Sequence, residues 1–274
     1  MKILVIGGGN MGLTYAQSFL RSHITSEKDM MILEKSPTKA EELSQKNIGT
    51  VYGEPEKCIK LADLVIFAVK PQDSDAVFKS IKPFVDFQQV FLSIMAGVKI
   101  KTICEALGTP KVIRAMPNLP AQIGMGMTAF TSSDEVTRIE LVMVQNLINT
   151  TGKTVYVEKE QSIDAATAIS GSGPAYVYYF MDAMIQAAQG MGFSTSEAEL
   201  LVSQTFKGAV DLYNKSDLSC KDWIKKVSSK GGTTEAAMRS FVENKVYKDI
   251  IEGAEAALNR AVELGKQKED VKNN

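Results

Sequence analysis

Met1-Lys-Ile-Leu-Val-Ile-Gly-Gly-Gly-Asn-Met-Gly12 opens the chain and sets its architecture. An apolar run, Ile3 to Ile6, leads into glycines at positions 7, 9 and 12, in the pattern Gly-x-Gly-x-x-Gly. In a dinucleotide site the first glycine permits a tight turn, the second lets the pyrophosphate approach the backbone, and the third lets helix and strand pack closely. A helix expected over residues 10–20 completes the context. The stretch therefore predicts a dinucleotide at a helix N-terminus, rather than a bare glycine-rich turn, contacted by Gly7, Gly9, Asn10, Met11 and Gly12.

The second predicted strand, Met30 to Leu33, ends at residues that give conflicting signals about the cofactor. Glu34 lies 22 positions after Gly12, where a carboxylate can accept hydrogen bonds from the adenosine ribose. Lys35 and Ser36 follow directly, and a cation with a hydroxyl suits a 2′-phosphate instead. Ser36 and Pro37 are also typical of the N-cap and first residue of a helix, here expected over residues 38–46. The choice between NADH and NADPH stays open on these residues.

Strands and helices then alternate. We expect strands over residues 50–51, 64–69, 90–94, 112–115, 125–131 and 154–157, and helices over 72–81, 100–107 and 135–149. Continuous apolar strands in this rhythm imply a parallel sheet covered on both faces. Ligands of such sheets bind outside the carboxyl ends of the strands. Ala68 to Pro71, Ala96 to Val98 and Met116 to Pro120 should therefore converge with the glycine loop.

The composition changes near residue 161, where strands stop. Expected helices cover residues 163–189, 196–213, 220–227, 233–244 and 247–264, with Gly265 as a C-cap and a fraying polar tail to Asn274. Pro174, in Gly171-Ser-Gly-Pro174, should kink or restart the first of them. The fold predicted is an α/β Rossmann-type dinucleotide-binding domain over residues 1–160 and an all-α domain over 161–274. The many alanines favour close helix contacts, either within one chain or between two chains of a homodimer.

Composition excludes several classes of function. A formal net charge of −1 gives no electrostatic case for nucleic acid, and no apolar run approaches the roughly 20 residues needed to span a bilayer. The three cysteines, Cys58, Cys104 and Cys220, are far apart, which fits a reducing cytoplasm better than disulfides or a metal cluster. The single histidine, His23, is expected in a surface loop. A histidine-based triad or multi-histidine metal site is thereby excluded, and with no signal-peptide pattern we expect a cytoplasmic protein.

One loop of the helical half has the composition of an anion site. Val227-Ser-Ser-Lys-Gly-Gly-Thr-Thr-Glu235 places two glycines and several hydroxyls before a helix expected to begin at Thr233. The free N–H groups of that helix can hold a carboxylate, with the helix dipole assisting. The alternative is an ordinary helix cap rich in Ser, Thr and Gly.

Six motifs together resemble the 1-pyrroline-5-carboxylate reductase family, in order over nearly the whole chain. They are Gly7-Gly-Gly-Asn-Met-Gly12, Ala68-Val-Lys-Pro71, Ala96-Gly-Val98, Ile113-Arg-Ala-Met-Pro-Asn118, Ser170-Gly-Ser-Gly-Pro-Ala-Tyr176 and Ser228-Ser-Lys-Gly-Gly-Thr-Thr234. The last two are specific to the family. The chain departs from the family at Lys230, where a proline is usual; this changes loop stiffness and adds a charge while leaving the glycines and Thr234 in place.

The resemblance implies hydride transfer from a nicotinamide cofactor to the cyclic imine of 1-pyrroline-5-carboxylate, giving L-proline. It implies that the Thr234 hydroxyl hydrogen-bonds the ring nitrogen as the catalytic contact, and that backbone around Ser229, Gly231, Gly232 and Thr233 binds the substrate carboxylate. The nicotinamide end would be lined by Lys70, Pro71, Ala96, Gly97 and Asn118, with Ala68 and Val69 in the same cofactor site. It further implies a preference for NADPH, with NADH possible, and an interlocked helical homodimer that can assemble further.

Two alternative functions fit the sequence less well. A β-hydroxyacid dehydrogenase would place a catalytic lysine on the long crossover helix, but residues 161–189 contain no lysine and Ala175 stands at the fourth position after Gly171. A non-catalytic nucleotide sensor would not need the Ser228–Thr234 loop.

Overall fold

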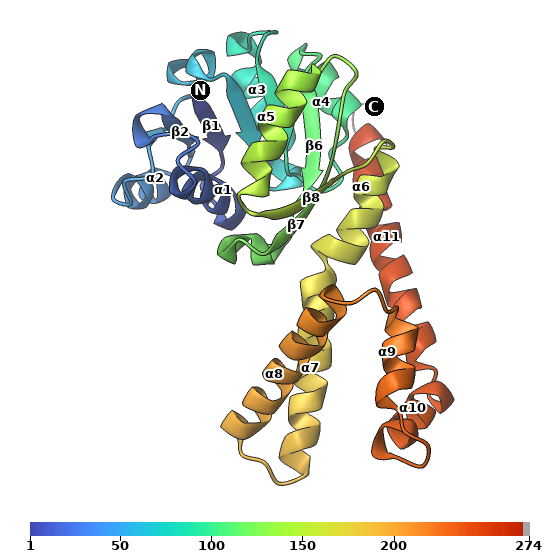
Figure 1. Cartoon of the computed structure of the whole chain (residues 1–274). Helices are drawn as coiled ribbons and strands as arrows, with labels where there is room; N and C mark the ends of the chain where they lie inside the picture. The colour runs from blue at the N-terminus through green and yellow to red at the C-terminus, as the bar shows by residue number, and fades with distance from the viewer. Residues whose placement is uncertain (271–274) are drawn as a thin grey trace. The chain divides into compact units, whose positions relative to one another are not determined.

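The computed structural model describes the backbone of residues 1–270 and the side chains of residues 1–266 (Figure 1). The expected fraying of the tail from residue 271 to Asn274 lies outside the described residues. The chain forms two compact units: one contains residues 1–172 and the chain from Ala257 onward, and the other contains residues 173–256. Among the described helices, none is both long and apolar enough to cross a membrane.

The first unit is built on an eight-stranded sheet with the order β3-β2-β1-β4-β5-β6-β7-β8. The strands are β1 (Ile3–Ile6), β2 (Met30–Leu33), β3 (Thr50–Tyr52), β4 (Leu64–Phe67), β5 (Val90–Ser93), β6 (Val112–Met116), β7 (Gly126–Ser132) and β8 (Gly152–Tyr156). The first six follow the strand order of a dinucleotide-binding Rossmann fold. The fold class expected from sequence is therefore confirmed.

The expectation of a wholly parallel sheet is wrong at one place, because β7 pairs antiparallel with β6. The chain between them contains only a short 3₁₀ turn, Leu119–Ile123, whereas a parallel return needs a crossover of a dozen or more residues. The chain therefore folds back on itself after Met116. A longer crossover through α5 (Arg138–Asn149) then brings β8 parallel to β7.

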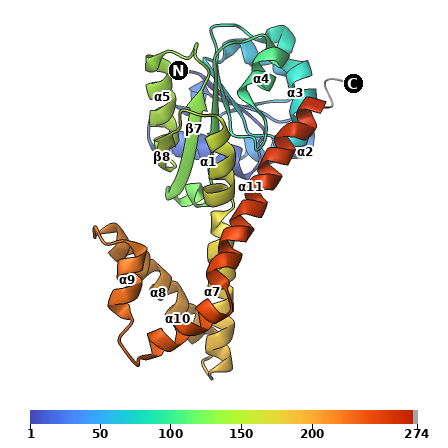
Figure 2. The ribbon, with the colours of Figure 1, turned by 90° about the vertical axis from the view of Figure 1, so that its right-hand side faces the viewer.

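Helices cover both faces of this sheet (Figures 1 and 2). One face buries side chains of α1 (Asn10–Arg21) and α5, with Leu43 from α2 (Pro37–Ser44). The other face buries side chains of α3 (Ser74–Ile81) and α4 (Ile100–Leu107). Strands covered on both sides are apolar at every position, as in β1 and β4. Each fully buried Leu, Ile or Phe contributes roughly 1.5–3 kcal/mol.

After β8 the chain becomes helical. α6 (Gln161–Ala166) is followed by a π-helical turn, Thr167–Gly171, and then by α7 (Gly173–Gly190), so the predicted restart at Pro174 is confirmed. The π turn itself was not predicted. The second unit continues with α8 (Thr195–Asn214), α9 (Cys220–Val227), α10 (Thr233–Glu243) and the start of α11 (Val246–Asp270). Compactness assigns α6 to the first unit; the domain boundary at residue 160 remains a prediction.

Gly265 is not the C-cap that the sequence suggested, because α11 runs through it to Asp270. In the first unit Gly265 lies against the loop after β5. A Cβ on Gly265 would lie 3.2 Å from the carbonyl oxygen of Gly97, and a Cβ on Gly97 would lie 3.1 Å from Leu264. The missing side chain at residue 265 therefore allows two backbone segments to approach closely.

Candidate active site

The carboxyl ends of the parallel strands meet at one edge of the first unit. Ile6 of β1 is in register with Leu33 of β2 and Phe67 of β4, and Phe67 is in register with Ser93 of β5. The loops beginning at Gly7, Glu34, Ala68 and Ile94 therefore start side by side. The expectation that residues 68–71 and 96–98 converge with the glycine loop is confirmed, and residues 116–120 follow β6, which pairs beside β5 with Ser93 in register with Arg114.

The glycine loop has the geometry that a dinucleotide needs. Gly7 has a φ of +104°, and a Cβ there would lie 2.9 Å from the Ala68 carbonyl oxygen. A Cβ on Gly12 would overlap the carbonyl oxygen of Gly7, so α1 can pack on β1 only without one. Gly9, in contrast, faces open space and is the N-cap of α1 with no side-chain cap. The first N–H groups of α1 thus remain available to an anion, which fits a pyrophosphate.

Glu34 is held against the glycine loop by two backbone donors. Its Oε2 accepts the Gly8 N–H at 3.1 Å, and its Oε1 accepts the Ser36 N–H at 3.0 Å. Ser36 Oγ in turn accepts the Lys39 N–H at 3.5 Å, so Ser36 caps α2 as predicted. The carboxylate and the cap that suits a phosphate therefore stand next to each other at the end of β2.

Asn118 ties three segments of the first unit together. Its Nδ2 donates to the Ser170 carbonyl oxygen at 3.2 Å, and its Oδ1 accepts the Met127 N–H at 2.8 Å. The amide thereby joins the turn after β6 to the π turn and to β7. Lys70 and Pro71 begin the short 3₁₀ turn after β4, with Lys70 as its extended N-cap.

The loop before α10, which lies in the second unit, is a separate candidate anion site. Gly231 adopts a left-handed φ of +72°, and the Gly232 N–H donates to the Ser229 carbonyl oxygen at 3.0 Å. Gly232 is the N-cap of α10 and supplies no capping side chain, whereas Ser194 and Ser219 cap α8 and α9. No hydroxyl side chain therefore caps α10, and its N-cap is a glycine, which is itself a common N-cap residue.

One residue in this loop was missed by the sequence analysis. Oε2 of Glu235, in the first turn of α10, accepts the Gly231 N–H at 2.7 Å. A carboxylate from the protein thus already contacts one of the N–H groups predicted to receive the substrate carboxylate. The signal was available in the sequence, since Glu three residues after an N-cap commonly reaches back to the loop.

A buried ionic cluster near the carboxyl edge was also missed. Arg114 of β6 is 1% exposed and forms ion pairs with Glu160 and Asp164. Helix α4 begins beside Glu160, and its own N-cap residue supplies no side-chain cap. The signal in the sequence was an arginine inside an otherwise apolar strand, Val112 to Met116.

The remaining reactive groups do not form a second centre in the described part of the chain. Burial raises the pKa of the Cys58 thiol to about 11 and also raises that of Cys104, so neither is a ready thiolate. No group of His, Cys, Asp and Glu that could hold a metal occurs among the residues the structure describes. His23 is exposed in the turn after α1, as predicted.

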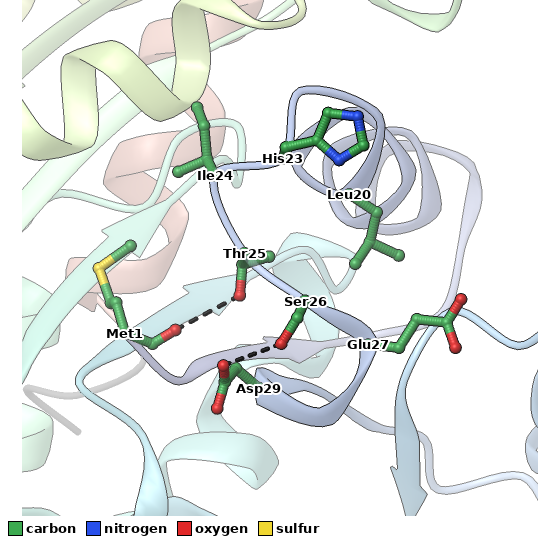
Figure 3. A pocket seen from close by; sticks show the side chains of 8 residues that line it. All are labelled: Met1, Leu20, His23, Ile24, Thr25, Ser26, Glu27 and Asp29. Carbon is green, nitrogen blue, oxygen red and sulfur yellow. Dashed lines mark hydrogen bonds between the residues drawn. The ribbon is translucent and has the colours of Figure 1, made fainter.

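A shallow pocket lies next to His23, away from the carboxyl edge (Figure 3). It is lined by Met1, by Leu20 of α1 and by residues of the connection between α1 and β2, so it lies at the amino ends of the first and second strands. Thr25 Oγ1 donates to the Met1 carbonyl oxygen at 3.4 Å, and Ser26 Oγ donates to Asp29 at 2.9 Å. These hydroxyls are already used within the protein.

Fold and site together define a Rossmann-type oxidoreductase that binds a dinucleotide, with an additional helical unit. Residues 2–97 match the family described as NADP oxidoreductase, coenzyme F420-dependent, and residues 160–264 match the one described as pyrroline-5-carboxylate reductase dimerisation. Pyrroline-5-carboxylate reductase 2 of Bacillus subtilis is 34% identical over 97% of this chain and 96% of its own length. The chain belongs to the pyrroline-5-carboxylate reductase family.

Comparison with solved structures supports the same family. The pyrroline carboxylate reductase of Plasmodium falciparum, with NADP bound, is 28% identical, has a TM-score of 0.88 and is matched over 97% of this chain and 98% of its own. The pyrroline-5-carboxylate reductase of Coxiella burnetii is 29% identical, with a TM-score of 0.87 and coverage of 96% and 98%.

Proposed function

We propose that the chain reduces 1-pyrroline-5-carboxylate to L-proline with a nicotinamide cofactor, the last step of proline biosynthesis. Besides family membership, the observation that carries this proposal is the start of α10. There, Gly231, Gly232 and Thr233 precede or begin a helix whose first N–H groups have no side-chain cap. Such a terminus suits the carboxylate of a small substrate.

Two parts of the loop act on the substrate in this proposal. Backbone N–H groups around Ser229, Gly231, Gly232 and Thr233 bind the carboxylate. The Thr234 hydroxyl hydrogen-bonds the ring nitrogen and orients the imine carbon. A protonated imine is already electrophilic, so positioning rather than a strong acid supplies most of the rate. The imine carbon gains a hydride, and the nitrogen, protonated before transfer, becomes the amine of proline.

The first unit binds the cofactor in this proposal. The N–H groups of Gly9, Asn10 and Met11 take the pyrophosphate, and the open space at Gly9 fits it. The nicotinamide supplies the hydride when bound. Lys70, Pro71, Ala96, Gly97 and Asn118 line that end of the site, and Ala68 and Val69 support the glycine loop. NADPH is the cofactor proposed, in keeping with the NADP bound to the Plasmodium relative, and Lys35 and Ser36 suit its 2′-phosphate.

We also propose that the chain works as a homodimer through its C-terminal helices. The family match over residues 160–264 is described by dimerisation, and large apolar side chains of the second unit are exposed, such as Tyr179 at 76% and Val242 at 75%. The three cysteines are unpaired, which supports the expected cytoplasmic location.

The test is turnover by the purified protein. We expect NADPH oxidation that depends on added 1-pyrroline-5-carboxylate, and Thr234→Ala should lower kcat about 10-fold or more with the dissociation constant of NADPH unchanged, because one hydrogen bond to the reacting ring is lost. Thr205→Ala on α8 removes a hydroxyl that bonds only the Leu201 carbonyl oxygen, and it serves as the matched control. Folded wild-type protein without turnover, with either NADPH or NADH, would reject the function.

A further inference from the structure

Arg114 is the largest side chain among those fully buried in the described residues, at 1% exposure in β6. It stands in the strand Val-Ile-Arg-Ala-Met, where all the remaining residues are apolar. A buried charge is costly unless it is paired and hydrogen-bonded. An arginine in such a place calls for a role beyond filling the core.

The guanidinium is paired with two carboxylates that come from the start of the helical segment. Arg114 Nη1 lies 3.0 Å from Glu160 Oε1, and Nη2 lies 2.6 Å from Asp164 Oδ1. Asp164 belongs to α6 and Glu160 is its N-cap residue. The fork of one arginine thus fixes the position and the rotation of α6 on the sheet.

Glu160 carries the contact further, to the loop after β5. The same Oε1 that meets Arg114 also accepts the Ile100 N–H at 2.8 Å. Ile100 is the first residue of α4, and α4 has no side-chain cap of its own. Glu160 therefore acts as a cap from another segment and fixes the point where the loop Ala96–Val98 enters the helix.

Apolar packing also holds the same loop. Ala96 packs on the small apolar cluster of Met116, Ala129 and Ile163, and Gly97 lies against Leu264 of α11. Val98 is fully buried in the core cluster on which Ile100 packs. The link from Arg114 through Glu160 to Ile100 adds a charged contact at the junction of the loop with α4.

We propose that Arg114 and Glu160 are positioning residues for hydride transfer, holding the loop Ala96–Val98 against the nicotinamide. This rests on the proposed function, in which Ala96 and Gly97 line that end of the cofactor. A loop displaced by about 1 Å can reduce a rate 100-fold without loss of fold. The guanidinium acts through Glu160 and touches no reacting atom itself.

The test compares variants that break different parts of the cluster. Glu160→Ala removes both the partner of Arg114 and the acceptor of the Ile100 N–H, so we expect kcat to fall about 10-fold or more and NADPH to bind more weakly. With NADPH deuterated at the transferred position, the isotope effect on kcat should rise, because hydride transfer becomes slower. Glu160→Gln keeps an acceptor for the Ile100 N–H and should recover part of the rate. Asp164→Asn neutralises the other partner of Arg114 without touching the loop and should change kcat less than twofold.

The matched control is Lys111→Met, just before β6. Lys111 pairs with Glu140 at 2.7 Å, in an ion pair of 18% and 20% side-chain exposure that holds α5 and does not reach the loop. It should lower the melting temperature and leave kcat, KM and the isotope effect unchanged. The proposal is overturned if Glu160→Ala loses stability but keeps wild-type kinetics and isotope effect. Wild-type turnover in the same assay separates that result from failure of the proposed function. If Glu160→Ala does not fold, Glu160→Gln and Asp164→Asn decide by the same kinetic difference.

Discussion

Glu235 competes, by its position, with the substrate proposed for the second unit. Its carboxylate accepts the Gly231 N–H at 2.7 Å, within the loop proposed to bind the substrate carboxylate. A negative side chain in the first turn of α10 also stabilises the helix, by about 0.3–1 kcal/mol. The residue thus stabilises the loop and opposes the binding of a second anion.

We predict that Glu235→Gln lowers KM for 1-pyrroline-5-carboxylate about threefold or more and leaves KM for NADPH unchanged. The neutral amide holds the Gly231 N–H less tightly and does not repel the incoming carboxylate. Steady-state kinetics with each substrate varied measure this. Glu243→Gln, at the other end of α10, provides the control and should change neither constant. A raised KM would instead make Glu235 part of the binding site.

Single residues could be predicted where a local sequence spacing identifies them. They could not be predicted where their role depends on a partner far away in the sequence. Gly7, Gly9 and Gly12 follow from a local pattern, because the tight turn between β1 and α1 sets their spacing. The pair of Arg114 with Asp164 joins positions 50 residues apart, and no local pattern indicates it. At Glu34 the sequence left a ribose and a 2′-phosphate both possible. The structure adds that the carboxylate is held by the amides of Gly8 and Ser36.

At the scale of elements, the crossing of α11 with the loop after β5 offers a comparison within one helix. Gly253 and Gly265 both lie inside α11, but only a Cβ on Gly265 would have neighbours, 3.2 Å away at the Gly97 carbonyl oxygen. Alanine is favoured over glycine in a helix by about 1 kcal/mol. We predict that Gly253→Ala gains about that much free energy of unfolding and that Gly265→Ala gains less or loses some.

The measurement is urea unfolding of both variants beside the wild type, at one protein concentration. Equal gains at both positions would show that the close approach of Gly97 and Gly265 imposes no constraint. Gly265→Leu extends the test, since a larger side chain must displace the loop and should weaken NADPH binding.

Most elements were predicted to within a few residues, because buried strands and amphipathic helices each carry a period. The reversal at β7 was missed although the connection after Met116 is too short for a parallel crossover. The close approach of Gly265 to Gly97 joins positions far apart in sequence, so no local window of sequence contains it.

At the scale of the whole molecule, the second unit has almost no hydrophobic core of its own. Within residues 173–256, Ala198 and Val202 are the buried apolar residues, while Leu200 is 69% exposed and Tyr247 is 73% exposed. A compact domain normally has a hydrophobic core that supports independent folding. The change from strands to alanine-rich helices indicated a separate unit, but sequence alone did not show that one copy leaves its apolar faces open. A second copy of the chain is the cover proposed above.

We therefore predict that Leu200→Glu shifts the protein from dimer to monomer and lowers its melting temperature, because a charge at that face loses its hydration on association. Glu199→Gln, the neighbouring exposed position on α8, should keep the wild-type mass and melting temperature. Light scattering gives the mass, and the wild-type melting temperature should rise with protein concentration, since association stabilises only the folded state. A wild-type protein that stays monomeric at high concentration, and melts at one temperature throughout, would contradict the dimer. Loss of turnover in the Leu200→Glu monomer would further tie catalysis to association.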